Sequence, residues 1–75
     1  MRWNLACRIV VIDGQGGKIG RQLVESIRLA LPEAEITAVG TNSAATSNML
    51  KGGARSGATG ENAVRVACRE ADIIA

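Results

Sequence analysis

Histidine, phenylalanine and tyrosine are absent from this chain of 75 residues, and tryptophan occurs only once. Without histidine, the protein lacks the usual general base near neutral pH and the commonest metal ligand, so we expect no metal site. Without phenylalanine and tyrosine, the core must be built from aliphatic side chains. The two cysteines, Cys7 and Cys68, are too few for a disulfide scaffold. We expect both to be reduced thiols in a cytoplasmic protein, with Cys68 packed in the core.

The chain also lacks long apolar runs and a strong charge of either sign. No stretch is long enough to cross a bilayer, and the apolar run near the N-terminus is too short for a signal peptide. The net charge is +2, and the basic residues are scattered without interleaved aromatics. This pattern argues against a nucleic-acid partner as well as a membrane partner. The length allows one small domain, which we place over residues 8–75, after an N-terminal extension of residues 1–7.

The first forty residues follow the order strand, helix, strand. Residues 9–12 form a continuous β-branched run, which is typical of a buried parallel strand. Residues 17–31 have a helical repeat, and residues 36–39 form a second apolar run. Together these segments predict a right-handed βαβ unit with parallel strands. The apolar stripe expected to face the core from the helix consists of Ile19, Leu23, Val24, Ile27 and Leu31.

The second half carries weaker signals for the same architecture. Asn42 and Ser43 can cap a short helix, and residues 57–60 form at most a vestigial strand. Residues 61–71 predict a further helix, and residues 72–75 begin a buried strand on the far side of the first one. The predicted fold is a Rossmann-like α/β domain with three layers and a parallel sheet, truncated after the start of this later strand. Because an unfinished sheet exposes apolar surface, we expect these 75 residues alone either to self-associate as a homo-oligomer or to fold poorly.

A glycine-rich segment joins the first expected strand to the first helix. Glycines at such a turn let the backbone approach a phosphate, which the amides and the dipole of the helix then attract. The spacing differs from the dinucleotide fingerprint G-x-G-x-x-G. It is nearer to the G-x-x-x-G-x-G loop of short-chain dehydrogenases, except that Lys18 occupies the position of the middle glycine. We therefore predict that a nucleotide or another phosphate ligand binds here; a purely structural turn is the alternative. The segment consists of Gly14, Gln15, Gly16, Gly17, Lys18, Ile19 and Gly20.

The end of the second expected strand lacks the acidic residue that usually holds a ribose in dinucleotide sites. Thr41, Asn42 and Ser43 follow there, and they can either bond a ribose or form a polar loop with a helix cap. Asp13 ends the first expected strand. It can orient a ligand hydroxyl or a hydrated cation, or it can fix the turn by bonding backbone amides. For both groups we favour the structural role.

Four stretches combine into a fairly specific pattern: residues 9–17, residues 38–43, the set Ala44, Thr46, Met49, Leu50 and Lys51, and residues 57–63. They resemble an uncharacterised bacterial family, domain of unknown function 3842, and the similarity extends over residues 8–75. The resemblance implies a cytosolic Rossmann-like protein that continues beyond this segment, and it brings no established activity. Lys18 departs from the glycine expected at its position, which would hinder the close approach of a phosphate.

Three functions remain open at this point. The protein binds a nucleotide without catalysis, as a sensor does, or it is an oxidoreductase that uses NAD(P), with catalytic residues beyond Ala75. Alternatively, it is a structural or interaction module whose glycines serve only the turn. The expected cofactor is NAD(P) or another nucleotide. No Tyr-x-x-x-Lys pair occurs, so the visible residues give no support to hydride transfer of the short-chain type.

Overall fold

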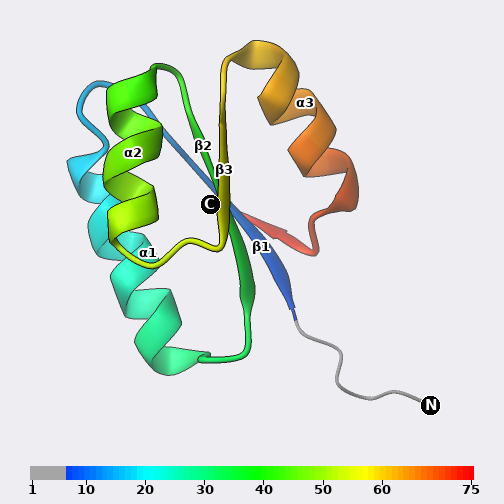
Figure 1. The fold of residues 1–75 in the computed structure, drawn as a ribbon. Helices are drawn as coiled ribbons and strands as arrows, with labels where there is room; N and C mark the ends of the chain where they lie inside the picture. The colour runs from blue at the N-terminus through cyan, green and yellow to red at the C-terminus, as the bar shows by residue number, and fades with distance from the viewer. Residues whose placement is uncertain (1–6) are drawn as a thin grey trace.

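The computed structural model describes residues 7–75 and contains a four-stranded sheet in which all neighbouring strands are parallel. Its order across the sheet is β3-β2-β1-β4 (Figure 1). This topology confirms the expected parallel α/β sheet, with the last strand beside the first. Of the expected N-terminal extension, all residues except Cys7 lie outside the described part of the chain. The strands are β1 (Arg8–Asp13), β2 (Glu35–Gly40), β3 (Ser56–Thr59) and β4 (Ile73–Ile74).

Three helices cover the two faces of this sheet. α1 (Lys18–Ala30) and α2 (Ser43–Lys51) lie on one face, and α3 (Glu61–Glu70) lies on the other (Figure 1). The result is a three-layer α/β domain of the Rossmann-like class, as the order of the apolar segments predicts. None of the helices within residues 7–75 is long and apolar enough to cross a bilayer.

β1 is central to the sheet because both β2 and β4 pair with it. Ile9 lies opposite Ile36 in β2 and opposite Ile73 in β4. The same register places Asp13 opposite Gly40, so the carboxyl ends of β1 and β2 lie side by side. The chain moves from β1 outward to β2 and β3, then returns to the far side of β1. Open α/β sheets bind ligands at the carboxyl edge beside such a reversal, and the glycine-rich loop follows β1 at that edge.

The main core lies between the sheet and the pair of helices α1 and α2. Within residues 7–75 it is built from aliphatic side chains and Met49. α3 covers the opposite face less completely, and none of its residues is buried. The expectation that Cys68 is a core residue is wrong, because this residue of α3 is only half-buried. The core cluster consists of Ile9, Val11, Val24, Ala34, Ile36, Ala38 and Met49.

α1 turns only part of its predicted apolar stripe to the core: Val24 and Ile27 pack there as expected, whereas Ile19, Leu23 and Leu31 do not. The structure buries Gly20 and Val24, whereas Ile19 is 75% exposed and Leu23 is 37% exposed. The reason is the close approach of the helix at Gly20, where a Cβ would lie 2.6 Å from the Sδ atom of Met49. A glycine at this position lets α1 settle against α2 and β1, and that contact moves Ile19 and Leu23 away from the sheet.

The two edge strands are both exposed. The sequence predicts a buried strand after residue 71, but Ile73 is 49% exposed and Ile74 is 53% exposed. β4 is exposed because it forms one edge of the described sheet and pairs with β1 alone. At the other edge, β3 is a regular strand of four exposed residues, where the sequence predicts at most a vestigial strand over residues 57–60.

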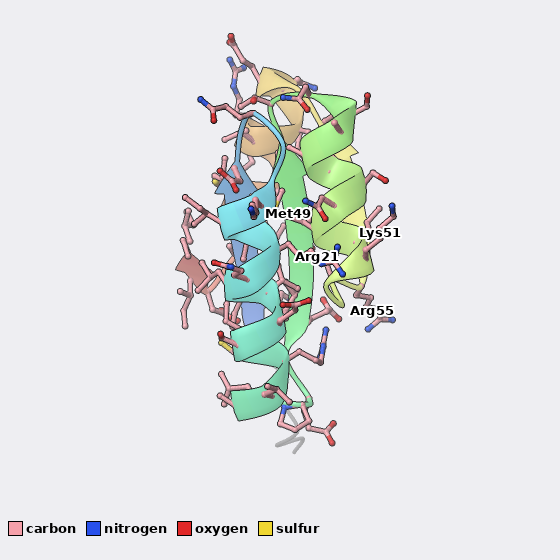
Figure 2. The ribbon with its side chains drawn as sticks, turned by 90° about the vertical axis from the view of Figure 1, so that its left-hand side faces the viewer. Arg21, Met49, Lys51 and Arg55 are labelled. Carbon is pink, nitrogen blue, oxygen red and sulfur yellow. The ribbon has the colours of Figure 1, made fainter. Side chains whose placement is uncertain are left out.

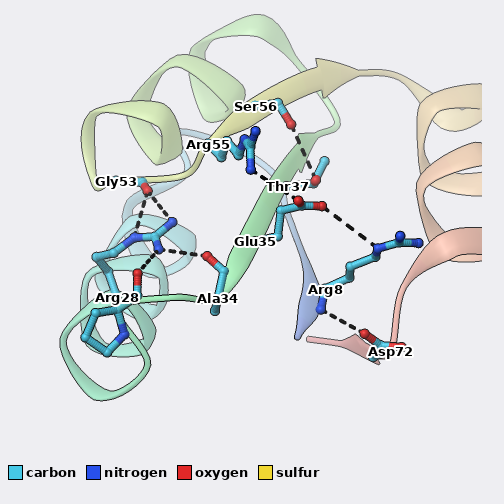
Figure 3. A network of polar contacts seen from close by, with 10 residues as sticks. Arg8, Arg28, Ala34, Glu35, Thr37, Gly53, Arg55, Ser56 and Asp72 are labelled. Carbon is cyan, nitrogen blue, oxygen red and sulfur yellow. Dashed lines mark hydrogen bonds and ion pairs between the residues drawn. The ribbon is translucent and has the colours of Figure 1, made fainter. Parts of the chain in front are cut away.

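Arg28 joins two loops at the amino edge of the sheet, and Figure 3 shows its contacts. Its guanidinium donates hydrogen bonds to the carbonyl oxygens of Pro32 at 2.9 Å, Ala34 at 2.7 Å and Gly53 at 3.1 Å. Arg28 therefore ties the end of α1 to the loop before β2 and to the loop after α2. The helical pattern alone places Arg28 on the solvent side and does not reveal these contacts.

A second polar cluster at this edge surrounds Glu35 (Figure 3). Its carboxylate lies 3.2 Å from Arg55 and 3.9 Å from Arg8. The backbone amide of Arg8 also donates to the carboxylate of Asp72 at 2.9 Å, next to β4. These side chains are well exposed, so the ion pairs contribute little to stability and mainly orient neighbouring loops.

Candidate functional site

The loop between β1 and α1 is a tight turn whose shape depends on Gly17. This residue has a left-handed φ of 71°, and its N–H donates to the carbonyl oxygen of Gly14 at 2.9 Å. A Cβ at Gly17 would lie 2.5 Å from the carbonyl oxygen of Ala45 in α2. Gln15 is also left-handed, with a φ of 49°, which is unfavourable for a residue with a side chain. The turn is therefore constrained by its own backbone and by its contact with α2.

Asp13 bonds the turn and the first turn of α1 at the same time. Its Oδ1 atom accepts a hydrogen bond from the amide of Gly14 at 2.8 Å, and its Oδ2 atom accepts one from the amide of Gly20 at 2.6 Å. The carboxylate therefore caps the N-terminus of α1, where the helix dipole favours a negative charge. This is the structural role that the sequence analysis favours. The Gly20 amide already has an acceptor within the chain.

Several amides before Gly20 lack such an acceptor. The N–H groups of Gly16, Lys18 and Ile19 donate no hydrogen bond to another residue within the described part of the chain. Lys18 and Ile19 begin α1, so their amides belong to the unpaired donors that open every helix. Such donors take their acceptors from water or from a ligand. Together with the amide of Gln15, which also has no acceptor in the described part of the chain, the loop therefore presents four unused backbone donors at the carboxyl edge of the sheet.

Packing within the protein accounts for three of the four loop glycines. A Cβ at Gly17 or at Gly20 would collide with α2, and a Cβ at Gly14 would lie 2.9 Å from the hydroxyl of Thr41. A Cβ at Gly16 would have no atom within 4 Å, and Gly16 does not have a left-handed φ. Gly16 is thus the loop glycine for which the surrounding protein supplies no steric reason.

The polar residues after β2 take different roles. The Oδ1 atom of Asn42 accepts a hydrogen bond from the amide of Ala45 at 2.9 Å, so Asn42 caps α2. The amide of Thr41 donates to the carbonyl oxygen of Asp13 at 3.0 Å, which holds the end of β2 beside the glycine-rich loop. Ser43 begins α2 and is exposed. The structure therefore brings Thr41 to the loop and gives Asn42 the capping role.

Asn48 is a residue of this region that the sequence analysis missed. Its Nδ2 atom donates to the carbonyl oxygen of Gly16 at 3.0 Å, and its Oδ1 atom accepts from Nη1 of Arg21 at 2.9 Å. Figure 2 shows Arg21 at the seam between α1 and α2, where this contact forms. Because 32 residues separate Asn48 from Gly16, no local pattern reveals the contact. A hollow of about 540 Å³ lies here, lined by Gly16, Lys18, Arg21, Gln22, Glu25 and Asn48.

Thr46 is a second missed residue, and it supports the edge of the sheet from within. It is a buried polar residue of α2. Its hydroxyl oxygen accepts a hydrogen bond from the amide of Gly40 at 3.1 Å and lies 3.0 Å from the carbonyl oxygen of Ala58. It also lies 2.8 Å from the hydroxyl of Thr59. Thr46 therefore joins the carboxyl ends of β2 and β3 to the helix that borders the loop.

Taken together, these groups suit the recognition of an anion. The site offers backbone amides, the Thr41 hydroxyl and the ammonium group of Lys18, which has no ion-pair partner within residues 7–75. In the same part of the chain, no group of three or more His, Cys, Asp or Glu residues is placed to hold a metal ion. The only acid in the turn, Asp13, is occupied by two amides.

The fold and this edge define a Rossmann-like parallel α/β domain with a glycine-rich turn after its central strand. The chain belongs to the family described as Domain of unknown function (DUF3842), whose model matches residues 8–75. No curated protein and no solved structure matches the chain.

Proposed function

We propose that the protein binds a nucleotide or another phosphate-bearing small molecule at the loop from Gly14 to Gly20. The observation that carries this proposal is made at Gly16, where a Cβ would have no protein atom within 4 Å. At the other three glycines of the loop, a Cβ would lie less than 3.0 Å from a protein atom. A glycine without a packing role suits a place where a ligand approaches the backbone. The unused amides of Gly16, Lys18 and Ile19 are the donors that a phosphate would accept from.

The position of the loop in the sheet supports the same proposal. It follows β1 at the carboxyl edge, beside the reversal of strand order between β1 and β4. The proposal names a phosphate group and not a particular dinucleotide, because the residues after β2 include no acid to hold an adenine ribose. NAD(P) remains one member of the ligand class, and the proposal includes no reaction.

Isothermal titration of ATP, NADH and NADPH into the wild-type protein and the Gly16→Val variant tests this proposal. We expect submillimolar binding of at least one ligand by the wild-type protein. The variant should lose affinity by at least about tenfold, because the valine side chain would occupy the place of the phosphate. A thermal melt should show that the variant remains folded, since the space around Gly16 is open.

Ser26→Val is the matched control, because Ser26 is an exposed residue of α1 that lies outside the loop. This variant should bind as the wild-type protein does. If the wild-type protein binds none of the three ligands below millimolar concentration, or if Gly16→Val binds them equally well, the glycines serve only the turn and the proposal is wrong.

A further inference from the structure

The hollow between α1 and α2 is directly continuous with the proposed phosphate site. Gly16 belongs to both, because its amide is unused and the residue also lines the hollow. The carbonyl oxygen of Gly16 is held by Asn48, which fixes the orientation of this peptide group against α2. A ligand bound to the loop amides would therefore have the hollow beside it, and because this hollow is open to solvent, a further polar group of the ligand can enter it.

Two cationic side chains line this hollow from one helix. Lys18 and Arg21 are three residues apart in α1, which places them on neighbouring positions of the same helical face. Lys18 is exposed and forms no ion pair with another described residue. Its ammonium group can therefore approach a ligand without breaking an existing contact, as a compact and mobile charge.

Arg21 is held in place, in contrast to Lys18. Its Nη1 atom donates to Asn48 at 2.9 Å, and its Nε atom donates to Glu25 at 3.2 Å. A guanidinium has five N–H donors, so these two bonds leave donors for a ligand. Glu25 balances one of the two positive charges, and the lining side chains retain a net positive charge.

From this arrangement we infer that the hollow takes a second phosphate group of the same ligand. The ligand class is then one with two or more linked phosphates, such as a nucleoside diphosphate or triphosphate, in preference to a monophosphate. Lys18 would supply the principal charge for the second group, while the loop amides hold the first. This inference rests on the proposed function, since it assumes that one phosphate lies at Gly16.

The test compares inorganic orthophosphate and pyrophosphate by isothermal titration without divalent cations. The wild-type protein should bind pyrophosphate about tenfold more tightly than orthophosphate, the gain expected from additional charge-assisted hydrogen bonds. Lys18→Met should remove most of this preference, because it should weaken the binding of pyrophosphate about fivefold more than the binding of orthophosphate. Lys51→Met is the matched control, because it removes the same charge from an exposed residue that does not line the hollow (Figure 2).

The outcomes separate the two proposals. If the wild-type protein binds both anions with equal affinity, or if Lys18→Met weakens the binding of both equally, the inference of a second phosphate group is wrong. The proposed binding of one phosphate at the loop is unaffected by either result. An effect of Lys51→Met as large as that of Lys18→Met also overturns it, because the preference would then reflect overall charge. If neither anion binds, or if Gly16→Val binds both as the wild-type protein does, the loop site fails and the second group fails with it.

Discussion

The carboxylate of Asp13 accepts a hydrogen bond from the amide of Gly20 at 2.6 Å, across seven residues. The chain thus supplies its own anion to the third helical residue of α1, while the first two amides of that helix remain unused. A phosphate at this loop would lie beside Asp13 rather than in its place. The stability of the turn and the affinity of the site should therefore respond to Asp13 in opposite directions.

Replacement of Asp13 tests this opposition. Asp13→Ala removes the cap of α1 and should lower the free energy of unfolding by about 1–2 kcal/mol. Asp13→Asn keeps an oxygen acceptor, so it should lose less stability, and it removes a negative charge beside the proposed phosphate. We expect Asp13→Asn to bind pyrophosphate more tightly than the wild-type protein. Urea denaturation and titration measure the two effects, and a stable Asp13→Ala variant would contradict the capping role.

Alanine at two glycines of the same loop should have opposite effects on stability. In Gly20→Ala the new Cβ would meet Met49 at 2.6 Å and Asp13 at 2.8 Å. Because Met49 is fully buried, we expect a loss of about 1–3 kcal/mol from overpacking. Gly16→Ala meets no atom and should be neutral or gain about 0.4–1 kcal/mol by restricting the unfolded chain. Chemical denaturation of the pair measures the difference, and similar stabilities would show that Gly20 is not closely packed.

Arg28 should stabilise the fold more than its partial exposure suggests. Arg28→Met keeps much of the aliphatic stem but loses the bonds to the carbonyl oxygens of Pro32, Ala34 and Gly53. We expect the free energy of unfolding to fall by about 1–3 kcal/mol. Arg65→Met is the control, because Arg65 is exposed on α3 and should change stability by less than about 0.5 kcal/mol. Equal denaturation midpoints for the two variants would show that the hydrogen bonds of Arg28 do not stabilise the fold.

The hydroxyl group of Thr46 should contribute more to the stability of the fold than its methyl group does. Thr46→Val is close in shape but leaves the buried amide of Gly40 without its acceptor. We expect a loss of about 1–3 kcal/mol for this variant, the penalty of an unsatisfied buried donor. Thr46→Ser retains the hydroxyl and should lose less. Thermal or urea denaturation ranks the variants, and a Thr46→Ser variant less stable than Thr46→Val would show that packing dominates.

The strands and the order of the sheet could be predicted because their signals are local. The β-branched run of residues 9–12 and the run of residues 36–39 are each closed by glycine or by a polar turn, and parallel pairing follows from the helix between them. The rotation of α1 could not be predicted in this way. Its apolar repeat points to Ile19 and Leu23, but the contact at Gly20 decides which side meets the core.

In the candidate site, too, some features have a local signal in the sequence and others depend on tertiary packing. The glycines of the loop can be recognised from the sequence, because a strand precedes them and a helix follows. The contact between Asn48 and Gly16 spans 32 residues, and it depends on how α2 lies against the loop. Contacts of this kind arise from tertiary packing, so neither periodicity nor residue type indicates them. The hollow lined by Lys18 and Arg21 follows from that packing and has no signal of its own in the sequence.

The attachment of β4 has a consequence for how the molecule opens. β4 has two residues, and its contact with Arg8 spans 64 residues, so its docking closes a much longer loop than the pairing of β1 with β2. The amide of Ile12 donates to the carbonyl oxygen of Ala75 at 2.9 Å, on the β4 side of the sheet. In hydrogen–deuterium exchange, Ile12 should therefore lose protection together with Asp72 and Ala75, although it lies in the central strand. The amides of Arg8 and Ile12 in β1 would then report the detachment of β4 while the β1–β2 ladder stays closed.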